Sequence, residues 1–89
     1  MQQKRLTIIN KLGLHARAAV KLVNTASRFS SEIIIRHNGR EINAKSVMNV
    51  MVMAASQGSI IELVISGEDE VQAMAALEKL INNRFGEEE

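Results

Sequence analysis

The 89-residue sequence predicts an α+β fold: an open-faced β-sandwich in which three helices cover one face of a four-stranded antiparallel sheet, in the order βαββαβα. Two patterns lead to this prediction. Four short segments predict strands by alternation, by β-branched content or by a hairpin signal. Two segments repeat apolar residues at helical spacing, and an apolar run after Ser46 predicts a third helix. A sheet with helices on one face buries all of these apolar stripes together. No repeat, linker or low-complexity segment divides the chain, so we expect one domain spanning residues 1–89.

The first strand and the first helix flank a short loop. Residues 4–9 form the predicted strand, with Leu6 and Ile8 on one face. Residues 10–14 form the loop, and helical spacing begins at Ala16. The apolar stripe of this helix comprises Ala19, Leu22, Val23, Ala26 and Phe29. Its outer stripe is mostly basic and comprises Arg17, Lys21, Asn24 and Arg28.

A hairpin and a second helix follow. Residues 32–37 and 40–43 are the predicted strands, and Asn38-Gly39 between them is a strong two-residue hairpin signal. Ser46 then precedes an apolar run, so we expect it to be the N-cap of a helix over residues 47–55.

The last strand and helix complete the pattern. Residues 59–66 alternate most regularly and predict the best strand of the chain. Gly67 turns the chain, and apolar residues at helical spacing predict a third helix over residues 71–84. We expect residues 86–89, a glycine and three glutamates, to form a solvated tail.

Composition narrows the class of protein. The chain has no Cys, Pro, Trp or Tyr, which excludes a disulfide framework and a zinc–thiolate site and fits a reducing compartment. No apolar run is long enough to span a membrane, and the N-terminus does not read as a signal peptide. We therefore expect a soluble, cytoplasmic protein without membrane contact, and nothing in the sequence demands more than a monomer.

The net charge of +1 conceals a strong asymmetry. Residues 1–50 have nine Lys or Arg and two Glu, a charge of +7, whereas residues 51–89 have two basic and eight acidic residues, a charge of −6. A basic surface of this kind favours a phosphate or an acidic partner.

The candidate site lies where the Gly-containing loop meets the first helix. His15 stands at this junction, after Gly13 and before Ala16 and Arg17. The first N–H groups of a helix lack intrahelical partners and the dipole favours an anion there, so a phosphoryl group on His15 could be received by the N–H groups of Ala16 and Arg17. The Arg17 guanidinium adds a permanent positive charge. An ordinary cap or surface histidine is the alternative interpretation.

The run KLGLHAR at residues 11–17, together with KSVM at residues 45–48, resembles the HPr family, the histidine-containing phosphocarrier proteins of the phosphoenolpyruvate-dependent phosphotransferase system. The resemblance covers essentially the whole chain. It implies that His15 accepts a phosphoryl group through Nδ1 from phosphorylated enzyme I and passes it to an enzyme IIA-type protein, while Arg17 steadies the group. The chain is then a reactant rather than an enzyme, and we expect no cofactor and no metal site.

Two further features follow from the resemblance. Ser46 matches a position that a dedicated kinase phosphorylates in some bacteria, and a plain N-cap is the other interpretation of this residue. The family usually has Pro after the arginine, whereas this chain has Ala18, whose backbone N–H could also serve the phosphoryl group. The His-Ala-Arg-Ala-Ala sequence is similar to the nitrogen-related, regulatory branch of the family.

The second helix has more apolar residues than one buried stripe needs. We expect Val47, Met48, Met51 and Val52, next to the basic stripe that includes Arg17, Lys21, Asn24 and Arg28, to form a docking surface for partner proteins. Alternatively, the methionines fill the core of a protein that has only two aromatic residues.

Two other functions compete with phosphate transfer. The basic first half is compatible with a nucleic-acid-binding module, but Phe29 and Phe85 both fall on core stripes, which leaves no aromatic side chain to stack on bases. A small regulatory domain that binds a metabolite or another regulator is the second alternative, and it does not require a histidine and an arginine at a helix start.

Overall fold

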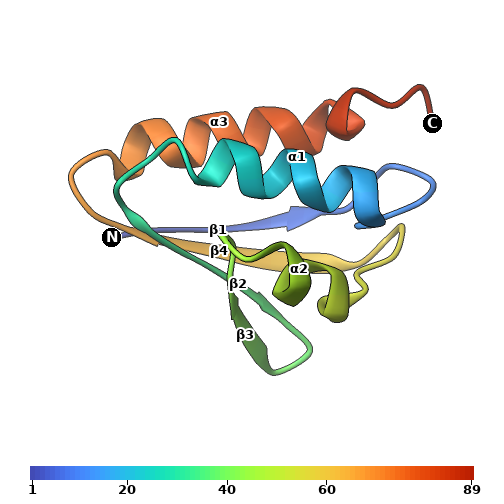
Figure 1. Cartoon of the computed structure of the whole chain (residues 1–89), viewed down its shortest axis with the longest axis horizontal. Coiled ribbons are helices and arrows are strands. Elements are labelled where there is room, and N and C mark those ends of the chain that lie inside the picture. Colours follow the sequence, from blue (N-terminus) through green and yellow to red (C-terminus); the bar gives the residue numbers. More distant parts are fainter.

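The computed structural model describes all 89 residues and confirms the predicted fold class and element order (Figure 1). The elements are β1 (Gln2–Thr7), α1 (Ala16–Ala26), β2 (Glu32–His37), β3 (Arg40–Asn43), α2 (Val47–Met53), β4 (Ile60–Ser66) and α3 (Glu70–Asn82), followed by a 3-10 turn, η1 (Arg84–Gly86). No helix combines the length and the hydropathy that a membrane span requires.

The four strands form one antiparallel sheet in the order β1-β4-β2-β3. The last strand is therefore inserted between the first and the second, which run parallel to each other and are connected through α1. Side chains along each strand point alternately to the two faces of the sheet, and one of these faces packs against the helices. The buried side chains on that side are Leu6, Ile8, Ile33, Ile35, Ile61, Leu63 and Ile65.

Helices α1 and α3 lie side by side along the sheet, while the short α2 packs against α1 and β3 (Figure 1). The apolar stripes meet the sheet in one core of 22 buried residues that includes Leu22 of α1, Val50 of α2 and Leu77 of α3. Ser46 is the N-cap of α2, as predicted, because its Oγ accepts a hydrogen bond from the backbone N–H of Asn49 at 3.3 Å.

The loop before α1 is fixed by Gly13. Its φ is +65°, and a Cβ at this position would lie 2.5 Å from the carbonyl oxygen of Ala55 and 2.8 Å from the Cα of Ser56. The next residue, Leu14, donates its backbone N–H to the same Ala55 oxygen at 2.8 Å. A side chain at position 13 would therefore separate the loop from the segment that follows α2.

The C-terminal segment differs from the sequence prediction in two ways. Helix α3 ends at Asn82, two residues earlier than expected, because Arg84, Phe85 and Gly86 adopt positive φ angles of 54°, 55° and 78°. Of the residues expected to form a solvated tail, Glu88 and Glu89 are exposed, but Glu87 is not. The chain turns back toward the start of α1 and places the Glu87 side chain, only 13% exposed, against His15.

Candidate functional site

His15 occupies the N-cap position of α1. Its backbone is extended, with φ −73° and ψ 177°, and its carbonyl oxygen accepts the N–H of Ala19 at 2.8 Å. The imidazole makes no capping hydrogen bond to the helix, and the side chain is 25% exposed. The ring therefore stands at the helix start and is open to a partner.

The first turn of α1 has free donors next to this ring. The N–H groups of Ala16, Arg17 and Ala18 precede the first intrahelical hydrogen bond, and none of them has another partner within the protein. Ala16 and Arg17 are exposed, but Ala18 is completely buried. The Ala18 N–H is therefore the least accessible of the three donors, and burial of this residue argues against a contact with phosphate.

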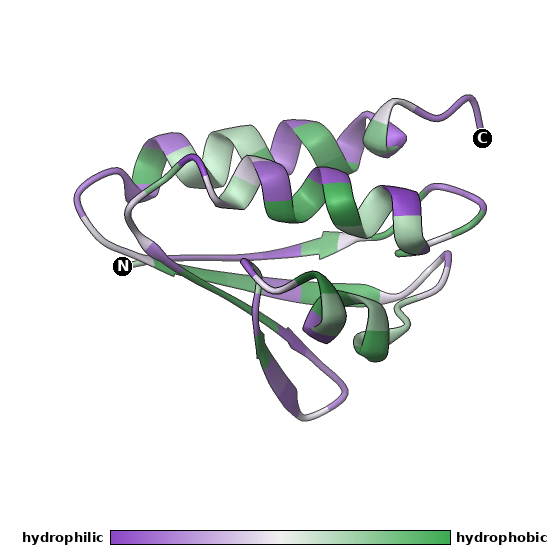
Figure 2. Ribbon diagram, in the orientation of Figure 1, coloured by the Kyte–Doolittle hydropathy of each residue, from purple (hydrophilic) through white to green (hydrophobic).

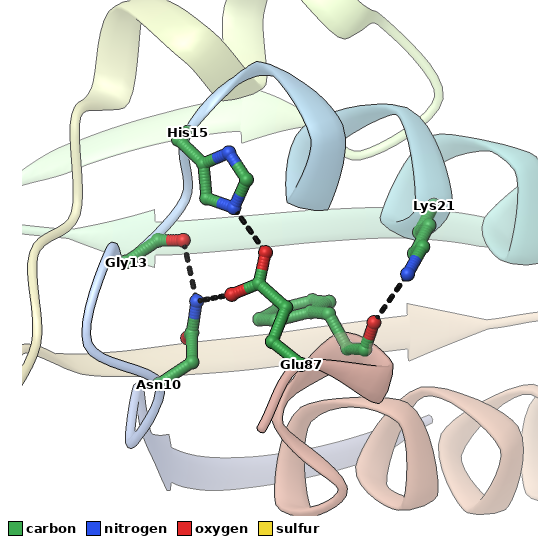
Figure 3. A network of polar contacts seen from close by, with 6 residues as sticks. Asn10, Gly13, His15, Lys21 and Glu87 are labelled. Atoms are coloured by element: carbon green, nitrogen blue, oxygen red, sulfur yellow. Dashed lines mark hydrogen bonds and ion pairs between the residues drawn. The ribbon is translucent and has the colours of Figure 1, made fainter. Parts of the chain in front are cut away.

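A polar network holds the other side of the imidazole (Figure 3). Nε2 of His15 is hydrogen-bonded to Oε2 of Glu87. The Asn10 amide nitrogen donates to Oε1 of Glu87 at 2.9 Å and to the carbonyl oxygen of Gly13 at 2.8 Å. Nδ1 of His15 makes no hydrogen bond within the protein, whereas Nε2 is engaged by Glu87.

The Glu87 carboxylate is ionised at neutral pH. Its pKa lies below the usual range, chiefly because the Asn10 amide donates to it, and also through its hydrogen bond to His15 and the charges of His15 and Lys21, against a partial desolvation that acts in the opposite direction. The site therefore contains a fixed negative charge at Nε2 and open N–H donors on the helix side of the ring.

Known proteins resemble this chain along its whole length. A family described as "PTS HPr component phosphorylation site" matches residues 2–83. A protein of Xylella fastidiosa named "Phosphocarrier protein HPr" is 56% identical over 88 residues, 99% of each chain.

The chain belongs to the HPr family. The curated relatives that it matches are named phosphocarrier proteins. The crystal structure of HPr-C-His from Thermoanaerobacter tengcongensis superposes with a TM-score of 0.96 at 45% identity, covering 100% of both chains. A second HPr structure from that organism, which covers 98% of this chain and 100% of its own at 45% identity and a TM-score of 0.79, is described as a dimer. The predicted monomer and the predicted nitrogen-related branch both stay predictions.

Helix α2 of this HPr chain consists mostly of apolar residues (Figure 2), and several of them are exposed. Met48, Val52 and Met51 are 75%, 65% and 44% exposed, while Val47 is half-buried and packs against the core. Leu12 is 67% exposed and extends the same surface toward the loop. Its exposure could not be predicted, because loop residues have no regular spacing.

A shallow hollow connects this apolar surface to His15. Leu12, Leu14 and Ala16 border it on one side, and Met51, Ala54, Ala55 and Ser56 border it on the other, with His15 among the lining residues. We call Leu12, Met48, Met51 and Val52 the apolar surface of the site.

The predicted basic face is smaller than the sequence suggests. Arg17, Asn24 and Arg28 are exposed and have no partner within the protein. Lys21 is instead half-buried and donates from Nζ to the carbonyl oxygen of Phe85 at 2.6 Å. It therefore holds the C-terminal segment in place rather than presenting a free charge.

Asn10 and Glu87 could not be predicted as site residues, because nothing in a loop asparagine or an acidic C-terminal run signals a contact with His15. The nucleic-acid alternative finds no support. Phe85 is 1% exposed and Phe29 packs against the core, so no aromatic side chain is free to stack on a base.

Proposed function

We propose that this chain carries a phosphoryl group on Nδ1 of His15, which it receives from phosphorylated enzyme I and delivers to an enzyme IIA-type protein. One observation supports the proposal most strongly: Nδ1 of His15 is unpartnered at a helix start whose first N–H groups are free. Such a helix start favours the negative charge of a phosphoryl group.

The chemistry needs little more than this arrangement. The Nδ1 lone pair forms the new N–P bond while the bond from phosphorus to the donor breaks, and the electron pair of that bond leaves with the donor. The phosphoryl oxygens accept hydrogen bonds from the N–H groups of Ala16 and Arg17, and the Arg17 guanidinium adds its charge. The chain is consumed and regenerated as a reactant, so turnover belongs to its partners.

The partners dock, in this proposal, on the apolar surface beside His15. Met48 and Val52 are the most exposed large apolar residues of α2, and the hollow leads from this helix to the histidine. Methionine-rich surfaces adapt to partners of different shape, as a carrier with a donor and an acceptor requires. Arg17, Asn24 and Arg28 lie exposed on α1 and would meet an acidic rim.

Ser46 is the proposed regulatory position. Its Oγ caps α2 two residues before the exposed Met48. A phosphate there would add two negative charges beside the apolar surface and would repel an acidic partner without unfolding the helix. Ser46→Asp, which keeps a capping side chain, is expected to slow phosphoryl transfer from enzyme I, whereas Ser46→Ala is expected to leave transfer unchanged; equal rates for both variants would contradict this regulation.

The test is the intact mass of the chain after incubation with phosphoenolpyruvate and enzyme I. We expect one acid-labile phosphoryl group on the native chain, none on His15→Ala, and one on the control His37→Ala, which removes the only other histidine. Purified sugar-type and nitrogen-type enzyme IIA proteins, offered in turn, decide which acceptor removes the group. A His15→Ala chain that still takes up one phosphoryl group would contradict the proposal.

A further inference from the structure

We propose that Glu87 is a positioning residue for phosphoryl transfer: its carboxylate holds the proton of His15 on Nε2 and so keeps the Nδ1 lone pair available. This inference rests on the proposed function and adds a residue to it from the opposite end of the chain. The hydrogen bond from Nε2 to Oε2 of Glu87 carries the argument, since the partner of one imidazole nitrogen decides the protonation of the other.

Both oxygens of the Glu87 carboxylate are engaged. Oε2 accepts from Nε2 of His15, and Oε1 accepts from the Asn10 amide nitrogen at 2.9 Å (Figure 3). The Glu87 side chain is 13% exposed, so it is not a mobile surface charge that happens to lie near the ring. An ionised carboxylate can only accept hydrogen bonds, and His15 must therefore supply the proton.

Asn10 fixes the carboxylate relative to the loop. Its amide nitrogen also donates to the carbonyl oxygen of Gly13 at 2.8 Å, so both amide hydrogens are used. The side chain is completely buried and its Oδ1 has no partner. Both acceptors bind the amide nitrogen of Asn10, so Gly13 and Glu87 determine the orientation of the side chain. In this orientation the amide oxygen is left without a hydrogen bond.

The backbone of the C-terminal segment is shaped to bring Glu87 to this place. Arg84 and Phe85 have φ angles of 54° and 55°, a conformation that non-glycine residues rarely adopt. The Phe85 side chain is buried in the core, and its carbonyl oxygen accepts a hydrogen bond from Lys21. Beyond Glu87, the carbonyl oxygen of Glu89 accepts the backbone N–H of Lys11. The segment is thus held on both sides of Glu87.

The carboxylate also suits the charge change of the reaction. When Nδ1 bonds to phosphorus, the neutral ring becomes positively charged, because the proton on Nε2 stays and the nitrogen lone pair is shared. A carboxylate at Nε2 stabilises that charge as it develops, in the way that a carboxylate orients and supports histidine in hydrolytic sites. No proton has to leave or arrive for the transfer to occur.

The experiment compares Glu87→Gln with Glu88→Gln, its exposed neighbour whose side chain makes no hydrogen bond or ion pair within the protein. Both variants lose one negative charge, but only the first alters the contact with His15. We measure the rate of phosphoryl transfer from enzyme I and the nitrogen chemical shifts of the His15 ring. We expect Glu87→Gln to be about tenfold slower, because the acceptor at Nε2 loses its negative charge, with shifted ring signals. We expect Glu88→Gln to match the native chain in both.

The outcomes separate the two proposals. If the native chain is phosphorylated and Glu87→Gln matches it in rate and in the His15 ring signals, the inference about Glu87 is wrong and the proposed function stands. If the native chain takes up no phosphoryl group, the proposed function is wrong and the inference about Glu87 falls with it. Thermal unfolding of both variants shows whether a slower rate reflects a lost fold, and an intact Glu87→Gln that transfers slowly supports the inference.

Discussion

At the residue scale, His15 and Arg17 lie two positions apart and differ in how firmly they are held. His15 is fixed on one side by Glu87, whereas the Arg17 side chain is exposed and has no partner within the protein. An arginine that is free in the resting carrier can close on a phosphoryl group without breaking an existing ion pair. Its contribution should therefore be visible in the rate of transfer and absent from the stability of the fold.

Arg17→Ala is expected to slow phosphoryl transfer by about tenfold, since a hydrogen bond to a charged group is lost. The free energy of unfolding should be unchanged, because an exposed arginine without a partner contributes little to it. The rate is measured by rapid quenching of the reaction with phosphorylated enzyme I. The control is Arg28→Ala, measured at the same concentration of enzyme I and at high salt, where electrostatic steering is screened. If Arg17→Ala transfers at the same rate as this control, Arg17 takes no part in the transfer step.

Gly13→Ala is expected to lower the free energy of unfolding by about 1–3 kcal/mol more than Gly39→Ala. Both glycines have positive φ, 65° and 78°, so both substitutions strain the backbone. Only at position 13 would the new Cβ meet other atoms, the Ala55 oxygen at 2.5 Å among them, while nothing lies within 4 Å at position 39. Urea denaturation measures the difference, and equal losses would show that the loop can move away from the segment after α2.

The sequence predicts His15 and Arg17 as candidate site residues, because a helix start is a local feature. Such a feature can be recognised in a run of seven residues. Glu87 and Asn10 could not be found in the same way. Glu87 is 72 residues from His15 and 77 from Asn10, and these contacts exist only after the left-handed turn at Arg84 and Phe85 redirects the chain. Nothing in the sequence indicates such a turn at a non-glycine residue.

At the element scale, hydrophobic patterns, the Ser46 cap and the Asn38-Gly39 hairpin signal together predict all seven helices and strands. The hairpin turn has the two positive φ angles that its sequence indicates. The boundaries shift where tertiary contacts decide them. Strand β1 begins at Gln2, two residues earlier than predicted, because Gln2 pairs with Ile65 of β4. Periodicity within one segment cannot show how far a neighbouring strand extends.

Asp69 links two elements and makes the fold sensitive to acid. Its carboxylate accepts the backbone N–H groups of Ser30 and Ser31, at 2.9 and 3.0 Å, and the Ser31 hydroxyl, which joins the start of α3 to the segment before β2. These hydrogen bonds, that of the Ser31 hydroxyl first, lower the pKa of Asp69 from 3.8 to about 2. Because the pKa is lower in the folded chain, the stabilisation is complete above pH 4 and is lost as the pH falls toward 2.

Asp69→Asn is therefore expected to reduce the loss of stability between pH 4 and pH 2, since the asparagine does not titrate. The measurement is the urea midpoint at a series of pH values. Glu68→Gln, which changes an exposed neighbour by the same charge, should keep the native slope. A variant Asp69→Asn with the native slope would show that other carboxylates determine the acid sensitivity.

At the scale of the whole molecule, the basic first half and the acidic second half of the chain meet across the sheet. Arg5 pairs in register with Glu62, Glu62 with Arg36, and Arg36 with Glu41, so charges alternate across all four strands. On the open face Arg36 forms ion pairs with Glu41 and Glu62, and elsewhere Lys4 and Lys11 pair with Glu78 and Glu89. The order of the strands, which the connection lengths do not determine, decides this pairing, so the sequence alone overestimates the basic surface left for partners.

The charges on α1 should therefore dominate electrostatic steering. We expect the association rate with enzyme I to fall as ionic strength rises, and Arg28→Ala to lower the rate at low salt by about two- to fivefold. The matched control is Arg40→Ala in the hairpin between β2 and β3, which is also exposed but not on α1. Stopped-flow association at several salt concentrations tests this, and an equal effect of both substitutions would mean that the overall charge, not a face, guides docking.

The most direct test of the account is to determine which nitrogen of His15 carries the phosphoryl group. Phosphorus and nitrogen NMR of the chain, phosphorylated by enzyme I, distinguishes the two ring positions. The structure leaves Nδ1 open at the start of α1 and engages Nε2 with Glu87. The account predicts a single phosphoryl group on Nδ1, with the proton retained on Nε2; a phosphoryl group on Nε2 would contradict both the proposed function of the helix start and the positioning by Glu87.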